Sequence, residues 1–115
     1  MNQKKINVKI HGCCYQNPHG EMGISYVIED QNGESETYCE WFDPKFGNSL
    51  NMAEYKALNK ALERLIELNL KASEIEVHTT SSMILLHYLG HSRPNRGYYV
   101  KEALIAGRYL NRFHN

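Results

Sequence analysis

Residues Ser49–Asn69, SLNMAEYKALNKALERLIELN, decide the fold, because they carry a long helical pattern. Their apolar positions recur at steps of three and four and form one stripe: Leu58, Ala61, Leu62, Leu65 and Leu68. Ser49 or Asn48 is suited to N-cap the helix, and one turn back the stripe reaches Glu54. A carboxylate in line with such a stripe is either a first-turn glutamate stabilised by the helix dipole or a group that faces a polar site at one end of a sheet.

The bulk composition predicts a single globular domain that spans residues 1–115. A length of 115 residues suffices for one core and leaves little room for a second. Lys plus Arg equal Asp plus Glu at 13 each, so the net charge predicts no class of partner. The chain has no apolar run of about 18 residues, and its polar start MNQKKIN is not a signal peptide, which predicts a cytoplasmic protein without membrane contact. Three cysteines, two of them adjacent, fit a reducing compartment.

The residues around this helix predict a mixed α/β sheet. Four stretches have the composition or alternation of strands: Lys5–His11, Gly23–Glu29, Glu36–Phe42 and Glu74–His78, the last with Ile75 and Val77 inward. Gly12–Gly20 is expected as a loop and Asn32-Gly33 as a hairpin turn. Two more helices are expected, a buried one at 81–89 with Thr79, Thr80 and Ser81 as candidate N-caps, and one at 98–113. A hairpin-joined trio followed by a helical crossover to a parallel fourth strand makes a layered α/β sheet.

Three segments, taken in order, match the motifs of one known family. HGCCYQNPHGEMGISYVIED at 11–30 resembles the opening of the ribonuclease H family, in which a strand ends in Asp-Gly and an Asn-Pro-Gly loop leads into the second strand. NMAEYKAL at 51–58 resembles the family's helix segment Asn-x-Ala-Glu-Tyr-x-Ala-Leu. EVHTTSSMILLHYLG at 76–90 resembles its fourth strand and the Asp-Ser start of the next helix. The resemblance implies an RNase H-like fold over most of residues 5–90.

The resemblance also implies a chemistry that can be checked at each position. Family enzymes cut the RNA strand of an RNA–DNA hybrid with two Mg²⁺ ions held by four carboxylates, because hard cations prefer charged oxygen ligands. Glu54 keeps the acid of the long helix, whereas His11 and Thr80 stand where the first and fourth strands would each end in an acid. The last acid follows a fifth strand, and we expect this chain to be a shortened member that ends at Asn115 without it.

Glu54 alone cannot balance the roughly four positive charges of two such ions. We therefore expect a catalytically impaired domain without a metal cofactor, which binds RNA–DNA hybrid, single-stranded nucleic acid or a protein. Nucleic-acid contacts are expected from Asn17, Asn51, Arg93, Arg96 and Lys101. Tyr98, Tyr99 and Tyr109 either stack on bases or, as we favour, pack the last helix onto the core. The alternative is an active, Mg²⁺-dependent RNase H-type hydrolase that works through Glu54.

Two further interpretations concern other parts of the chain. Without a fifth strand, Glu74–His78 presents a free edge, which predicts a homodimer or a protein partner that pairs there. Zn²⁺ prefers imidazole and thiolate ligands, and these occur in two groups: His11, Cys13, Cys14 and His19, and His78, His87 and His91. Their spacing matches no common zinc pattern, so we favour small buried thiols and surface histidines.

Overall fold

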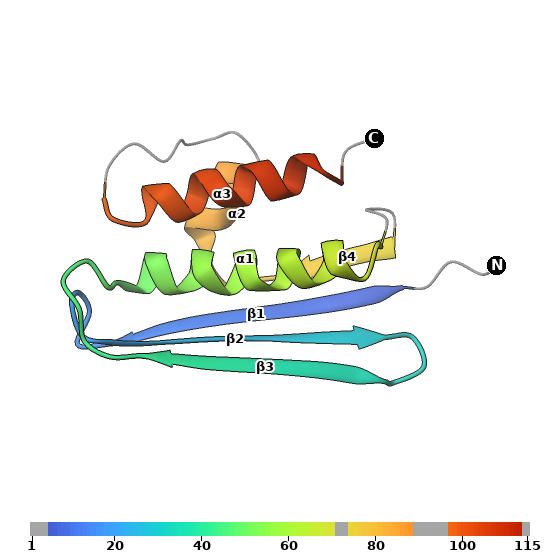
Figure 1. Cartoon of the computed structure of the whole chain (residues 1–115), viewed down its shortest axis with the longest axis horizontal. Helices are drawn as coiled ribbons and strands as arrows, with labels where there is room; N and C mark the ends of the chain where they lie inside the picture. The colour runs from blue at the N-terminus through green and yellow to red at the C-terminus, as the bar shows by residue number, and fades with distance from the viewer. Residues whose placement is uncertain (1–4, 71–73, 89–96, 114–115) are drawn as a thin grey trace.

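The computed structural model describes residues 5–70, 74–88 and 97–113. The elements are β1 (Ile6–Tyr15), β2 (Glu21–Asp30), β3 (Ser35–Phe42), α1 (Leu50–Glu67), β4 (Ile75–His78), α2 (Ser82–Tyr88) and α3 (Val100–Asn111). The strand order is β3-β2-β1-β4, and only the β1–β4 pair is parallel. The three helices lie on one face of this sheet (Figure 1). The predicted mixed sheet, with its antiparallel trio and helical crossover, is confirmed.

The core lies between the sheet and α1. In β1, the side chains of Ile6, Val8 and Ile10 are buried, whereas the residues between them are exposed, as the alternation predicts. On α1, Leu62 and Leu65 are almost completely buried in the same core. Each such side chain contributes about 1.5–3 kcal/mol through burial, so this apolar stripe fixes α1 over the strands.

The first two strands are longer than the sequence predicts. β1 continues to Tyr15 and β2 begins at Glu21, so the predicted loop Gly12–Gly20 is reduced to residues 16–20. The antiparallel register continues through Gly12 and through the pair Cys13 and Gly23. Gly12 was interpreted as the start of a loop, but it lies within β1, and in the facing strand a Cβ at Gly23 would lie 2.3 Å from the ring of Trp41. The missing side chain therefore serves close packing within the sheet.

Three predictions of burial are wrong. Leu68 is 41% exposed because it follows the last turn of α1. Val77 is exposed because β4 lies at the edge of the described sheet. In α2, only Ile84 is buried, whereas Leu85 and Leu86 are exposed, because a helix of seven residues has just one face on the core. The predicted helix end at Gly90 and most of the predicted loop 91–97 lie outside the described residues.

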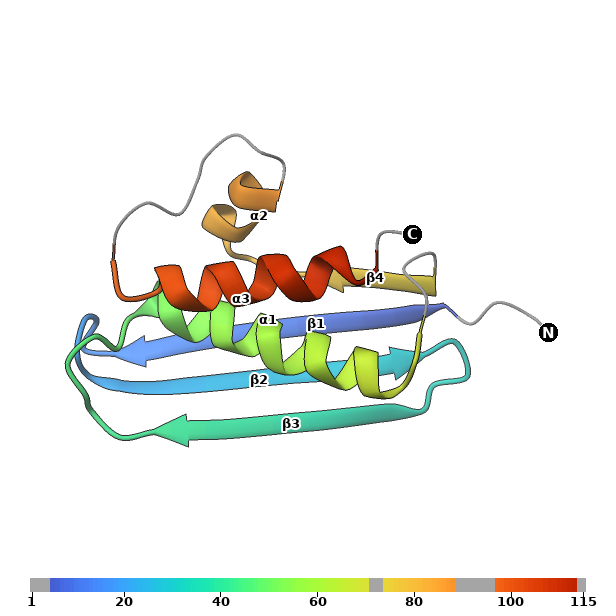
Figure 2. The same cartoon turned by 45° about the horizontal axis from the view of Figure 1, so that its top comes forward.

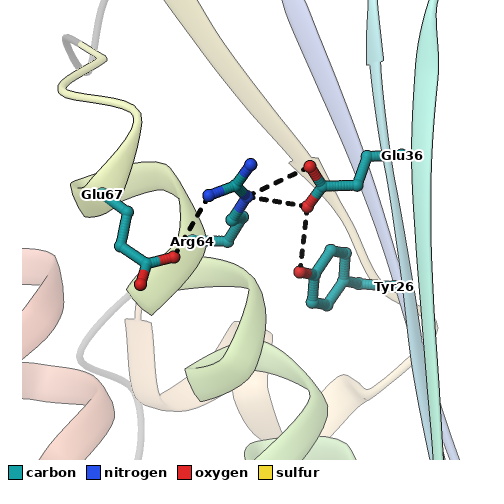
Figure 3. Close-up of polar contacts among 4 residues, drawn as sticks. All are labelled: Tyr26, Glu36, Arg64 and Glu67. Atoms are coloured by element: carbon teal, nitrogen blue, oxygen red, sulfur yellow. Dashed lines mark hydrogen bonds and ion pairs between the residues drawn. The ribbon is translucent and has the colours of Figure 1, made fainter.

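A polar network fixes the second half of α1 to the sheet (Figure 3). Arg64 Nε donates to both carboxylate oxygens of Glu36 on β3, at 2.8 and 3.1 Å, and Arg64 Nη1 donates to Glu67 at 3.3 Å. Tyr26 on β2 donates its hydroxyl proton to Glu36 at 3.2 Å. The network thus joins β2, β3 and α1 at the end of the sheet opposite the start of α1.

The last helix lies beside α1 (Figure 2). Glu102 accepts hydrogen bonds from Lys56 at 3.3 Å and from Asn59 Nδ2 at 3.0 Å, and Tyr109 donates to Glu63 at 2.9 Å. The contacts of Glu102 place the first turn of α3 beside the second and third turns of α1. Within the described ranges, none of the helices is both long and apolar enough to cross a membrane.

Candidate active site and nucleic-acid interface

The candidate site lies where β1 passes beneath the first turns of α1. A Cβ at Gly12 would lie 2.5 Å from the backbone carbon of Ala53 and 2.5 Å from the backbone nitrogen of Glu54. Backbone atoms cannot move aside like the end of a flexible side chain, so only glycine permits this approach. Gly12 therefore fixes the position of Glu54 relative to the neighbouring His11.

Two side-chain caps hold the start of α1. Ser49 Oγ accepts a hydrogen bond from the backbone N–H of Met52 at 3.0 Å, which confirms Ser49 as the N-cap. Asn17 Oδ1 accepts from the backbone N–H of Leu50, also at 3.0 Å. Asn17 comes from the turn between β1 and β2, so this second cap ties the end of β1 to the helix that carries Glu54.

Glu54 is half-buried, and its surroundings act on its charge in opposite directions. Burial raises the pKa of its carboxyl group, whereas a hydrogen bond with Ser81 and the charge of His11 lower it. Ser81 is buried and its Oγ also accepts from the backbone N–H of Ile84 at 3.1 Å, so it caps α2 as one of the predicted candidates. The structure therefore brings Glu54, His11 and Ser81 together.

His11 and Thr80, where the resemblance implies acids, differ in their surroundings. His11 is exposed on β1, opposite Ser25 of β2, and it is close enough to Glu54 to act on its pKa. Thr80 is exposed just after β4, and the next residue, Ser81, forms the hydrogen bond with Glu54.

These residues do not fit a pair of Mg²⁺ ions. Among residues 5–70, 74–88 and 97–113, no three His, Cys, Asp or Glu side chains converge where they could hold a metal ion. Mg²⁺ takes oxygen ligands, with carboxylates supplying the charge, and Glu54 is accompanied by an imidazole and a hydroxyl. Neither proposed zinc group forms such a convergence within those ranges, and His91 lies outside them.

Several solved structures with the same architecture are RNase H1 structures. LC11-RNase H1 in complex with an RNA/DNA hybrid has a TM-score of 0.80 and 26% identity, over 95% of this chain and 78% of the other. LC11-RNase H1 isolated from compost by a metagenomic approach has a TM-score of 0.75 and 27% identity, over 96% of this chain and 79% of the other. RNase H1 from the halophilic archaeon Halobacterium salinarum NRC-1 has a TM-score of 0.79 and 21% identity, over 95% of this chain and 79% of the other. The chain has an RNase H-like fold. No protein-family model matches the sequence, and no curated protein matches it.

The expected nucleic-acid contacts of this RNase H-like chain have different environments. Asn17 is exposed but uses its carbonyl oxygen as a helix cap. Asn51 is half-buried in the first turn of α1, and Lys101 is exposed in the first turn of α3. Both helices begin at the same end of the molecule (Figure 1). Arg93 and Arg96 lie outside the described residues.

The three tyrosines near the C-terminus divide into two kinds. Tyr99 stacks on Tyr55 with ring centroids 5.9 Å apart, and Tyr109 donates to Glu63, so both pack α3 onto α1 as we favoured. Tyr98 remains 57% exposed. Packing therefore accounts for Tyr99 and Tyr109 but leaves Tyr98 available at the surface.

Sequence reasoning missed the role of Ser81 at the site. Its candidacy as an N-cap was evident, but capping uses the oxygen as an acceptor and leaves the hydroxyl proton free for Glu54. The available signal was the Ser81 hydroxyl directly beside Thr80, at the end of a strand expected to reach the polar site.

Proposed function

We propose that this RNase H-like domain binds RNA–DNA hybrid and does not hydrolyse it. The observation that carries the proposal is that, among the described residues, Glu54 is the one carboxylate found at the site, in a fold shared with LC11-RNase H1, whose structure is solved with an RNA/DNA hybrid. Hydrolysis by two metal ions needs several carboxylates to balance about four positive charges. Binding of the hybrid needs only a matching shape and phosphate contacts.

The electrostatics of the site support the same proposal. Burial favours the uncharged form of Glu54, and the Ser81 hydrogen bond is directed at this one carboxyl group. A neutral or singly charged pocket attracts Mg²⁺ weakly, and it also repels a phosphate backbone less than a cluster of four carboxylates would. His11 and Thr80, which stand where the resemblance implies acids, therefore favour binding of nucleic acid without a bound metal ion.

Binding is tested by fluorescence anisotropy with labelled RNA–DNA hybrid, single-stranded RNA, single-stranded DNA and duplex DNA. We expect binding of the hybrid that weakens as salt is raised, because phosphate contacts release counterions. Lys101→Gln should weaken binding and reduce the slope of log K against log salt by about one. Lys5→Gln, at the other end of β1, is the matched control. Absence of binding to the hybrid at low salt would contradict the proposal.

Hydrolysis is tested separately, on a gel with labelled hybrid and either Mg²⁺ or Mn²⁺. We expect no cleavage by the parent chain beyond that of the Glu54→Gln variant. Cleavage that this substitution abolishes would instead support the alternative, an active RNase H-type hydrolase that works through Glu54.

A second proposal concerns β4, which we infer pairs with β4 of a second copy of this chain. β4 lies at the edge of the described sheet, and Glu76, Val77 and His78 are exposed. Beside it runs an apolar groove of about 590 Å³, lined partly by exposed side chains of α2 and α3: Leu85, Tyr88 and Leu104. An open edge next to an apolar surface favours pairing with another strand.

Charge complementarity favours a second copy as the occupant. In an antiparallel pair of β4 strands centred on Val77, two-fold symmetry places Glu76 of each copy opposite His78 of the other, so that two such pairs form. The two side chains already attract each other within one strand, with His78 Nε2 3.0 Å from the Glu76 carboxylate. Cross-strand pairs of opposite charge stabilise a sheet by about 0.2–1 kcal/mol each.

Sedimentation equilibrium tests this pairing. We expect a dimer that dissociates on dilution. Glu76→Lys and His78→Glu should each weaken it, because each places like charges opposite one another across the two-fold axis. The double variant Glu76→Lys/His78→Glu restores the complementary pairs and should restore the dimer. A parent chain that stays monomeric at all concentrations would contradict self-pairing.

A further inference from the structure

Three aromatic side chains from separate segments meet at the surface near the start of α1. The ring of His19 stacks on Phe46 with centroids 4.3 Å apart and planes 11° apart. Phe46 meets Tyr98 edge to face, at 5.2 Å and 80°. Phe46 is 69% exposed and Tyr98 57% exposed despite these contacts. We refer to His19, Phe46 and Tyr98 as the aromatic platform.

Hydrogen bonds between two loops hold the aromatic platform. The backbone N–H of Gly47 donates to His19 Nδ1 at 2.9 Å, and the backbone N–H of His19 donates to the Asn48 carbonyl at 2.7 Å. The buried Asn48 side chain donates to the carbonyl oxygens of Gly20 and Asp43, both at 3.0 Å. These hydrogen bonds fix the His19 ring and the loop that carries Phe46, whereas the Phe46 and Tyr98 rings are largely exposed.

Gly47 completes the support beneath Tyr98. Its φ of +102° favours glycine, and a Cβ there would lie 3.1–3.5 Å from the Cγ, Cδ1 and Cβ atoms of Tyr98. The tyrosine ring thus lies directly against the loop backbone. Such close support keeps the ring in one orientation and reduces the entropy that is lost when a ligand binds to it.

We propose that the aromatic platform stacks an unpaired nucleobase from the single-stranded end of a bound hybrid, which rests on the proposed function. Flat aromatic faces stack on any base. Exposed Lys45 precedes Phe46 in the same loop, and exposed Lys101 lies one turn after Tyr98, so cations for the phosphates flank the rings. The larger apolar surface, the groove beside β4, lies elsewhere on the molecule.

The test compares the affinity for a blunt hybrid with the affinity for the same hybrid carrying a short 5′ or 3′ overhang. One of the overhangs should tighten binding by the parent chain about fivefold or more, the factor expected from one stacked base. Phe46→Ala and Tyr98→Ala should lose this gain while keeping the blunt-hybrid affinity, and Phe46→Trp should retain it. The fluorescence of 2-aminopurine in that overhang should be quenched on binding to the parent chain.

Tyr88→Ala is the control, because Tyr88 is 60% exposed but lies on α2 beside the apolar groove. It should leave the gain from the overhang unchanged. If the parent chain binds the blunt hybrid but gains nothing from either overhang, or if Phe46→Ala keeps the gain, the base-stacking proposal is wrong and the proposed function stands. If no hybrid binds at all, both proposals fail.

Discussion

The carboxyl group of Glu54 links the stability of this chain to pH. Burial raises its pKa in the folded chain above that of an unfolded glutamate, about 4.3. Protonation of Glu54 therefore stabilises the folded chain. This contribution to stability is fully present below the pKa of an unfolded glutamate, and it is lost as the pH rises through the raised pKa of the folded chain. We expect Glu54→Gln, which keeps an acceptor for Ser81, to be more stable than the parent chain at about pH 7 and not at about pH 3.5. Urea unfolding at both pH values measures this, and an equal difference at both would contradict it.

Gly12 is the residue at which backbone packing decides the position of the site. Gly12→Ala would place a methyl group 2.5 Å from the backbone of α1, so β1 and α1 must separate. We expect a loss of about 1–3 kcal/mol in the free energy of unfolding. The matched control is Gly107→Ala, where nothing lies within 4 Å of the added Cβ and helix propensity predicts a gain of about 0.5–1 kcal/mol. Equal effects of the two substitutions in thermal melting would refute this account.

Among the elements, α1 depends on a cap from outside its own sequence. Asn17 Oδ1 accepts from Leu50 N–H, so Asn17→Ala should reduce the free energy of unfolding by about 1 kcal/mol. Asn17→Asp keeps the acceptor and places a negative charge at the helix N-terminus, so stability should be retained. If Asn17 also contacts phosphates, the aspartate variant should bind the hybrid less well despite its stability. Chemical unfolding and anisotropy on the same samples separate the two roles.

The other end of α1 depends on an ion pair that solvent partly screens. Hydrogen bonds from Arg64 lower the pKa of Glu36 in the folded chain. The ionised carboxylate therefore stabilises the folded chain at pH values above the pKa of an unfolded glutamate. This stabilisation is lost as the pH falls through the lowered pKa of the folded chain. Both side chains are more than a third exposed, so the effect is small. Arg64→Met should lower the melting temperature at low salt and much less at high salt. Arg108→Met on α3 serves as the control, and a loss independent of salt would indicate a packing effect instead.

At the scale of the whole molecule, the sheet brings residues from distant segments to one end. β1 and β4 run parallel with Lys9 paired to His78, so Thr80 follows β4 on the side of His11, whose charge acts on Glu54. We expect His11→Asp/Thr80→Asp to place additional carboxylates around Glu54. Mutual repulsion should lower the melting temperature of this double variant, and Mg²⁺ or Mn²⁺ should raise it again by binding the folded state.

The parent chain and the single variant His11→Asp provide the comparison for this experiment. Both should show a smaller shift of melting temperature with Mn²⁺ than the double variant, because fewer carboxylates balance the ion. A double variant that the metal does not stabilise would mean that residue 80 does not face the pocket. The position of Ser81 would then be the better place for a third acid.

Local patterns were sufficient to predict much of the fold. The stripe on α1, the alternation in β1 and the Asn32-Gly33 turn each depend on neighbours in the sequence, and each is present in the structure. The errors at Leu68 and Val77 have one cause: exposure depends on whether another element covers a residue, which no local pattern contains. Gly12 was interpreted as a loop residue for the same reason, because the backbone that it contacts belongs to Ala53 and Glu54 on another element.

By itself, the sequence determined the order and type of the elements and, through the resemblance to the ribonuclease H family, predicted the comparison of Glu54 with His11 and Thr80. Only the tertiary structure decided that Ser81 bonds to Glu54, that Asn17 caps α1 and that His19, Phe46 and Tyr98 meet at the surface. The physical reason is range: helix and strand periodicity arises from interactions over a few residues, whereas these contacts join residues from 27 to 52 positions apart, which only the folded sheet and helices bring within reach.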